Sequence, residues 1–278
     1  MTPLSSADID WLAKLLSDVG TAEIMPKFRN LGDGAIQQKT SASDLVTEAD
    51  VAAERVITKA LLERFPGSMV IGEEAVSDNS GLLDGWADTD RRVFVVDPID
   101  GTFNFASGVA SFGVMLRVVE NGETVAGIIH DPVGRDSIMA QKGSGAVLRR
   151  SGGRESELKV AQSPGSMSQM IGAASYHMMN EPDRSNVARN LSRCLGSVGY
   201  RCAAQEYRLL AGGHIHFAIY NKLMPWDHLA GALITQEAGG HVRRFDGSLY
   251  LPAHLDGGLL AATDPDSWNM LRQGMWQA

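Results

Sequence analysis

The sequence Val-Phe-Val-Val-Asp-Pro-Ile-Asp-Gly-Thr at residues 93–102 joins an apolar run directly to two acids. The run at 93–96 predicts a buried strand, since a short apolar stretch of branched and aromatic side chains bounded by turn residues is typical of one. Asp97 and Asp100 then stand at the end of this strand, where proline and glycine favour a tight turn. Because a buried carboxylate beside a second one is unstable without a cation, the stretch indicates more than a turn.

The turn also offers the oxygen ligands that hard divalent cations need. The carbonyl of Ile99 lies between the two carboxylates, and Thr102 adds a hydroxyl beside them. This combination predicts a metal-assisted phosphate site, in which bound metal supplies the positive field that an acidic chain needs for an anionic substrate.

The composition is that of an ordinary globular protein. The chain has 278 residues, 44% of them hydrophobic and 21% charged, with a net charge of -8 that argues against nucleic acid as the main partner. Its two cysteines, Cys194 and Cys202, have no metal-type spacing, which predicts reduced thiols and a cytoplasmic location. No signal peptide and no run long enough to span a membrane is evident, so a membrane partner is not expected.

Hydrophobic periodicity predicts helices and strands along the whole chain. In the first half, helices are predicted over 7–30 and from an N-cap at Thr47 to about Phe65, with strands over 69–71, 111–119, 124–130 and 137–141, a hairpin at Asn121-Gly122 and a Gly-rich run at 143–153. In the second half, strands are predicted over 169–174, 214–220 and 242–245, with helices over 183–195, 203–211 and 226–238.

This order predicts a layered α+β or α/β fold in two lobes. Residues 1–150 would form N-terminal helices and an antiparallel sheet that carries most metal ligands. Residues 151–278 would form a smaller mixed sheet covered by helices, which supplies Asp227 and the pocket wall. The site is expected between the lobes.

Three further segments place acids at the ends of predicted elements: Asp44 to Asp50, Gly72-Glu73-Glu74 and Trp226-Asp227. Each is weak by itself, because acids at helix starts are usually caps and adjacent acids are usually solvated.

Together with the 97–102 turn, these segments resemble the inositol monophosphatase family, which are magnesium-dependent, lithium-sensitive phosphatases. The resemblance covers most of the chain and also rests on Lys39, Asn104-Phe105, Asp131-Pro132, Gly231 and Glu237 to Gly240. It implies an αβαβα sandwich and a homodimer.

The resemblance implies a set of two or three Mg²⁺ ions. Glu73, Asp97 and the carbonyl of Ile99 would hold the first ion. Asp97, Asp100 and Asp227 would hold the second, and a third, weaker ion would use Glu73 and water. Two metals suit this reaction because they can lower the pKa of a bound water and stabilise the leaving oxygen.

The resemblance also implies the catalytic groups. Glu73, with Thr102 and Asp50 behind it, would orient the attacking water, and no phosphoenzyme is expected. The backbone of Gly101 and Thr102 would bind phosphate oxygens, and Lys39 would lie near the site as a positive charge.

The sequence departs from the family pattern in the substrate pocket. The acid that reads inositol should lie seven residues before Asp227, but that position is Tyr220. Arg201 replaces a glycine of the pocket wall, where it could bind a carboxylate or a second phosphate, or instead form a surface or interface salt bridge. The residues expected to contact substrate are Lys39, Ile99, Asp100, Gly101, Thr102, Arg201, Cys202, Ala203, Tyr220 and Asp227.

The sequence therefore predicts a magnesium-dependent phosphomonoesterase that acts on a small polar metabolite. Inositol monophosphate is the default substrate, with histidinol phosphate, a sugar bisphosphate and a 3'-phosphorylated nucleotide as alternatives. Two hypotheses from other functional classes remain open: a regulatory binding protein and a vestigial metal-binding structural protein, both on the same fold. Retention of every acidic position favours the enzyme.

Overall fold

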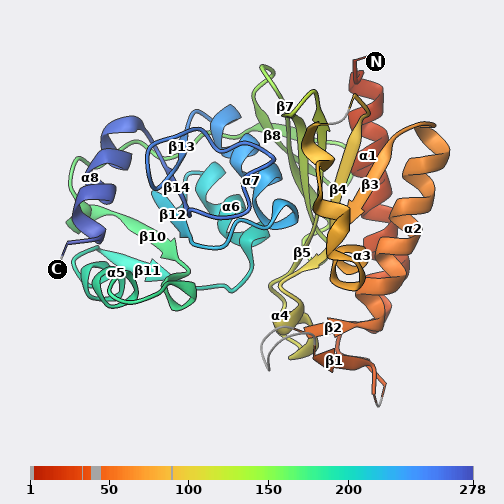
Figure 1. Ribbon diagram of the computed structural model, residues 1–278, viewed down its shortest axis with the longest axis horizontal. Helices are drawn as coiled ribbons and strands as arrows, with labels where there is room; N and C mark the ends of the chain where they lie inside the picture. Colours follow the sequence, from red (N-terminus) through yellow and green to blue (C-terminus); the bar gives the residue numbers. More distant parts are fainter. Residues whose placement is uncertain (1–2, 33, 39–44, 89, 278) are drawn as a thin grey trace.

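The computed structural model describes residues 3–32, 34–38, 45–88 and 90–277. It stacks helices and sheets in five layers (Figure 1), as the resemblance implied. Helices α1 and α2 cover the outer face of the first sheet, α6 and α7 fill the space between the sheets, and α5 and α8 cover the outer face of the second. The helices are α1 (Ser6–Val19), α2 (Glu48–Arg64), α3 (Glu73–Asp78), α4 (Thr102–Ala106), α5 (Asp183–Leu191), α6 (Ala203–Ala211), α7 (Pro225–Glu237) and α8 (Pro265–Met275).

The first sheet has seven strands in the order β3-β4-β5-β6-β7-β8-β9. β3 runs parallel to β4, and the remaining pairs are antiparallel. Its strands are β3 (Met69–Gly72), β4 (Val93–Asp100), β5 (Gly113–Glu120), β6 (Glu123–Asp131), β7 (Asp136–Gln141), β8 (Ala146–Arg150) and β9 (Glu155–Glu157), and a separate hairpin pairs β1 (Ile36–Gln38) with β2 (Leu45–Thr47). The first sheet continues past residue 150, because β9 belongs to it. The division of the chain into two lobes at residue 150 stays a prediction.

The second sheet has five strands in the order β11-β10-β12-β14-β13. β11, β10 and β12 are parallel, so their carboxyl ends meet at one edge. The strands are β10 (Ile171–Ala174), β11 (Gly196–Val198), β12 (Phe217–Tyr220), β13 (His241–Arg244) and β14 (Leu259–Ala262).

Several local predictions are confirmed and others are wrong. Thr47 caps α2, and the Asn121-Gly122 hairpin joins β5 to β6 with left-handed φ values of 51° and 74°. The helix predicted over 7–30 ends as an α-helix at Val19 and continues in a wider and then a tighter winding to Lys27. The Gly-rich run at 143–153 contains strand β8 at its centre, where residues 146–150 pair antiparallel with β7. The glycines of the run flank this strand.

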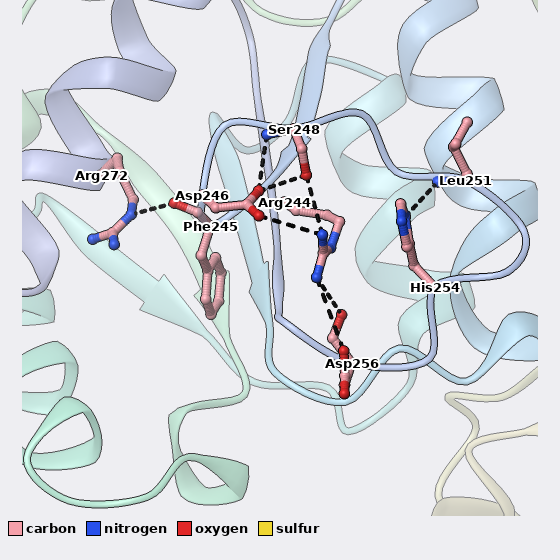
Figure 2. Close-up of polar contacts among 8 residues, drawn as sticks. All are labelled: Arg244, Phe245, Asp246, Ser248, Leu251, His254, Asp256 and Arg272. Carbon is pink, nitrogen blue, oxygen red and sulfur yellow. Dashed lines mark hydrogen bonds and ion pairs between the residues drawn. The ribbon is translucent and has the colours of Figure 1, made fainter.

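The connection between β13 and β14 is tied down by charged side chains (Figure 2). The Arg244 guanidinium donates to Asp246 and Ser248 of the turn that follows β13, and to the Asp256 carbonyl near the start of β14. Arg272 of α8 donates to the Phe245 carbonyl at 2.7 Å. These contacts fix a loop whose middle carries Tyr250 toward the space between the sheets, where it packs against two apolar clusters of the core.

Among the described residues, none of the helices combines the length and the apolar character that crossing a bilayer requires.

Candidate active site

A bulge in β4 brings two acids to the same side of the first sheet. Side chains three residues apart on a regular strand point to opposite faces. Here Asp97 pairs with Met115 and Asp100 pairs with Gly113. Between these two pairs, β4 contains one residue more than β5, which makes a β-bulge. The extra residue turns Asp100 toward the face that Asp97 already uses.

Glu73 reaches the same place from the neighbouring strand. β3 is parallel to β4 and pairs Gly72 with Val96, so Glu73 lies beside Asp97 at the carboxyl end of the pair. Glu54 of α2 holds the start of α3 here, because its carboxylate accepts from the backbone N–H groups of Glu74 at 2.8 Å and of the next residue at 2.9 Å. A Cβ at Gly72 would lie 2.2 Å from Glu54 Cδ, so only glycine permits this approach.

Asp227 completes a cluster of three carboxylates. It lies in the first turn of α7, which crosses the inner face of the first sheet. Carboxylate oxygens of Glu73, Asp97 and Asp227 lie within 4.8 Å of one another. Three segments spread over about 150 residues of the sequence therefore converge, as the sequence predicted.

The electrostatics of this cluster fit a divalent cation. Asp97 is 1% exposed, and its Oδ1 has no hydrogen-bond partner among the described residues. Burial, followed by the nearby charges of Glu73, Asp100 and Asp227, raises the pKa of Asp97 well above its usual value. Burial and the charges of Glu73 and Asp100 do the same to the pKa of Asp227. An unsatisfied carboxylate oxygen among like charges is the environment that a cation relieves.

Asp100 is engaged on its other side. Its Oδ2 accepts from the backbone N–H of Ala204 at 2.6 Å and lies 3.0 Å from Cys202 Sγ. Burial raises the pKa of Asp100 to about 6, and these hydrogen bonds oppose the rise. The contacts join the 97–102 turn to the start of α6, so Cys202 and Ala203, two predicted pocket residues, lie at the junction of the two sheets.

Thr102 connects the turn to α2. Its Oγ1 lies 2.9 Å from the Ile99 carbonyl oxygen and 3.1 Å from Asp50 Oδ1. Asp50 also closes the capping box of α2, accepting from the Thr47 backbone N–H at 2.9 Å. Burial, together with the charge of Glu73, raises the pKa of Asp50 to about 6. The Asp50 carboxylate therefore both caps α2 and faces the site.

A buried arginine, which the sequence analysis did not single out, lies beneath the carboxylates. Arg117 of β5 is fully buried, and its Nη1 donates to the Trp226 carbonyl at the start of α7. Its Nε and Nη2 have no hydrogen-bond partner within the described part of the chain. Burial lowers the pKa of Arg117 to about 9, while Tyr250, Asp97 and Asp227 act to raise it. The guanidinium thus stays charged and partly neutralises the cluster.

A cavity of about 540 Å³ opens over the carboxylates. Tyr220, at the predicted inositol-reading position, is 3% exposed and forms its wall. The Tyr220 ring packs against His228 at 4.5 Å and Tyr207 at 5.2 Å between centroids. Burial lowers the pKa of His228 to about 3, so this imidazole is neutral and serves packing.

Other polar residues of the cavity wall escaped the sequence analysis, among them Ser175, Glu206 and Lys222. His177, which the sequence suggested for the pocket border or a dimer interface, lines the cavity as well. Glu206 is 4% exposed, and burial raises its pKa to about 7. The available signal for Lys222 was a basic residue two positions after the strand predicted over 214–220. Lys39 and Asp44 lie outside the described residues.

The fold and the carboxylate cluster define a phosphatase of the layered α+β kind. The model of the inositol monophosphatase family matches residues 8–277, and the chain belongs to this family, whose members are phosphoric monoester hydrolases. It is 30% identical over 240 residues to the fructose-1,6-bisphosphatase/inositol-1-monophosphatase of Thermotoga maritima, covering 86% of this chain and 85% of that one.

Two further comparisons agree. The chain is 33% identical over 212 residues to the Nus factor SuhB of Pseudomonas aeruginosa, covering 74% of each protein. A solved structure of a Thermotoga maritima inositol monophosphatase superposes with a TM-score of 0.77 at 26% identity, covering 96% of this chain and 94% of that one. The αβαβα sandwich predicted from the resemblance is confirmed.

Proposed function

We propose that the protein is a magnesium-dependent phosphomonoesterase that hydrolyses a small polar phosphate ester. The observation that carries the proposal is the buried Oδ1 of Asp97, which has no hydrogen-bond partner in the described part of the chain and lies among the carboxylates of Glu73 and Asp227. Hard oxygen ligands of this kind suit Mg²⁺, which needs few protein ligands because it keeps several waters.

In this proposal Glu73, Asp97 and the Ile99 carbonyl would hold one ion, and Asp97, Asp100 and Asp227 would hold a second. A third, weaker ion would use Glu73 and water. When bound, Mg²⁺ supplies positive charge to the phosphoryl oxygens and lowers the pKa of a water molecule. The contacts of Asp100 Oδ2 with the Ala204 backbone N–H and with Cys202 Sγ hold this carboxylate at the start of α6.

The chain's own groups position the reactants. The Thr102 hydroxyl, set between Asp50 and the Ile99 carbonyl, orients a water beside Glu73. The Asp50 carboxyl, whose pKa lies near 6, can take a proton from that water through Thr102. The backbone N–H groups of Gly101 and Thr102 bind phosphate oxygens, and the left-handed φ of 86° at Gly101 sets this turn.

Phosphate release from a panel of monoesters tests the proposal. We expect turnover of at least one sugar or inositol phosphate with Mg²⁺, its loss with a chelator and its reduction by Li⁺. Absence of turnover by folded, Mg²⁺-binding protein would refute the proposal and favour a binding role. The proposal extends to a cytoplasmic homodimer, for which the family resemblance and two unpaired cysteines are the support. Sedimentation analysis tests the dimer.

We expect Mg²⁺ to stabilise the protein more at pH 8 than at pH 5.5. The pKa values of Asp97, Asp100 and Asp227 are raised in the folded, metal-free protein, to about 6 for Asp100 and well above the usual value for the other two. From about pH 4 upward the folded state therefore holds more protons than the unfolded chain, and its free energy of unfolding falls as pH rises. Mg²⁺ displaces these protons and recovers the loss.

The measurement is the melting temperature with Mg²⁺ minus that with chelator, at each pH. This difference cancels the contribution of the buried His130 and His228, whose lowered pKa values of about 4 and about 3 act in the opposite direction. An equal or smaller Mg²⁺ effect at pH 8 would contradict the expectation.

Arg117→Met should tighten Mg²⁺ binding at pH 8. The substitution roughly keeps the volume but removes a buried positive charge that repels the ion. At an effective dielectric constant of about 20, loss of such a charge should lower the dissociation constant roughly tenfold. Calorimetric titration measures it, with the exposed Arg154→Met as the matched control. Unchanged or weaker binding would show that Arg117 does not counter the cluster.

A further inference from the structure

Each of the three parallel strands of the second sheet is followed by a basic residue. His177 comes three residues after β10, Arg201 three residues after β11, and Lys222 two residues after β12. Because the carboxyl ends of these strands meet at one edge, the three side chains converge, and all three line the 540 Å³ cavity above the carboxylates. Carboxyl ends of parallel strands are common ligand sites.

We infer that the substrate carries a second anionic group, a phosphate or a carboxylate, which Arg201, His177 and Lys222 bind while the first phosphate lies at the acidic cluster. This inference rests on the proposed phosphatase function. It narrows the substrate class from phosphate monoesters in general to those with two separated anionic groups.

Arg201 is held in place at an energetic cost. Its φ of 50° lies in the left-handed region, which disfavours side chains other than glycine and a few polar ones. The guanidinium stacks over the Phe103 ring at 4.1 Å, and the preceding Tyr200 carbonyl accepts from Asn104 at 2.7 Å. A strained, stacked arginine at a cavity is an outlier that points to function.

None of the three bases forms a salt bridge among the described residues, although the charge of Lys222 reaches Asp227 and acts to lower the pKa of that carboxyl. Within the described residues, none of Arg201, His177 and Lys222 has a carboxylate oxygen within 4.0 Å, although all three are exposed. Burial, followed by the charge of Arg201, lowers the pKa of His177, and both side chains line the same cavity. The Asn221 amide donates to the Met178 carbonyl at 2.9 Å and so ties the segment of His177 to that of Lys222. An anion would satisfy this unpaired positive charge, and the Arg201 fork suits bidentate contact with it.

The anionic subsite adjoins the reaction centre. Cys202 and Ala204, directly after Arg201, contact Asp100, so Arg201 lies at the rim of the same cavity. A cavity of about 540 Å³ is larger than a single phosphate needs and accommodates a short carbon skeleton with an anionic group at each end.

The experiment compares matched esters with one and two anionic groups. Fructose 1,6-bisphosphate is set against fructose 1-phosphate and fructose 6-phosphate, and 2-phosphoglycerate against glycerol 2-phosphate. We expect kcat/KM about tenfold or more higher for at least one doubly charged ester, as charge-assisted hydrogen bonds predict. The two pairs distinguish a second phosphate from a carboxylate.

Arg201→Gly then removes the side chain and also relieves the left-handed backbone, so the variant is expected to fold. We expect it to lose most of the preference, about tenfold, because kcat/KM should fall further for the doubly charged esters than for the singly charged ones. Arg201→Lys should keep part of the preference, and Arg154→Ala, at an exposed site, should keep all of it.

The outcomes separate the two proposals. Hydrolysis of singly and doubly charged esters at equal kcat/KM would overturn the inference and leave the phosphatase function intact, as would an equal loss for both in Arg201→Gly. Hydrolysis of none of the esters would overturn the proposed function and the inference with it.

Discussion

Asp97→Asn is expected to abolish magnesium-dependent phosphate release, by about a thousandfold or more, while the protein stays folded. Asp97 is the ligand that both proposed ions share, and asparagine offers a weaker oxygen and no charge in its place. The side chain is 1% exposed and its pKa is raised well above the usual value, so the folded protein already tolerates a neutral group there. In chelator the melting temperature should stay the same or rise.

Calorimetry and phosphate release, measured together, decide the matter. Mg²⁺ affinity should fall with activity in Asp97→Asn, whereas the exposed control Asp18→Asn should change neither. Turnover near the normal rate in Asp97→Asn, or Mg²⁺ binding as tight as before, would remove Asp97 from the metal site.

The sequence predicted the parts of the site whose signals are local. Each of these signals lies within a window of a few residues. They are the buried strand β4 with its two acids, the capped start of α2 and the acid Glu73 directly after β3. The bulge that turns Asp97 and Asp100 to one face was not predictable this way. It depends on the pairing of β4 with β5, which is a relation between segments.

Arg117 and Glu54 show what local patterns leave out. Arg117 interrupts the apolar run of β5, where a charge is usually taken as solvent-facing, but the strand is central and α7 covers that face. Glu54 has the spacing of an ordinary helix residue, yet its carboxylate holds the start of α3 and thereby Glu73. Both roles arise from tertiary contacts over long separations.

At position 220 the sequence predicted which residue lies at the pocket wall, but it could not predict what that residue contacts. We expected a tyrosine at the pocket wall, and the structure has it there, stacked on His228 and Tyr207. Such a buried ring gives substrate an apolar face and not the two acceptors of a carboxylate. Outside the acidic cluster and Asp100, the cavity is lined by one more carboxylate of the described residues, Glu206 of α6, whose pKa burial raises to about 7. Polyol recognition by a carboxylate at position 220 is therefore not available to this chain.

Gly231→Ala should destabilise the protein by about 3 kcal/mol or more and lower activity in whatever remains folded. A Cβ at Gly231 would lie 2.1 Å from Tyr207 Cγ. The Tyr207 ring is fully buried, with its hydroxyl 3.3 Å from His228 Nδ1, so it has no space to rotate away. On the other side, Gly127 of β6 packs against the α7 backbone, since a Cβ there would lie 2.9 Å from Ala230 Cα. The overlap must therefore move α7, and with it Asp227.

Denaturation in urea measures the loss, and Gly196→Ala is the matched control, because a Cβ there meets Ile171 only at 3.8 Å. Helix propensity alone would make alanine at 231 the more stable residue, by up to about 1 kcal/mol, so the sign of the effect separates packing from propensity. Tyr207→Leu should absorb part of the cost in a double-mutant cycle. A Gly231→Ala protein as stable as the unsubstituted one, or a cost unchanged by Tyr207→Leu, would show that α7 is not held against α6 at this point.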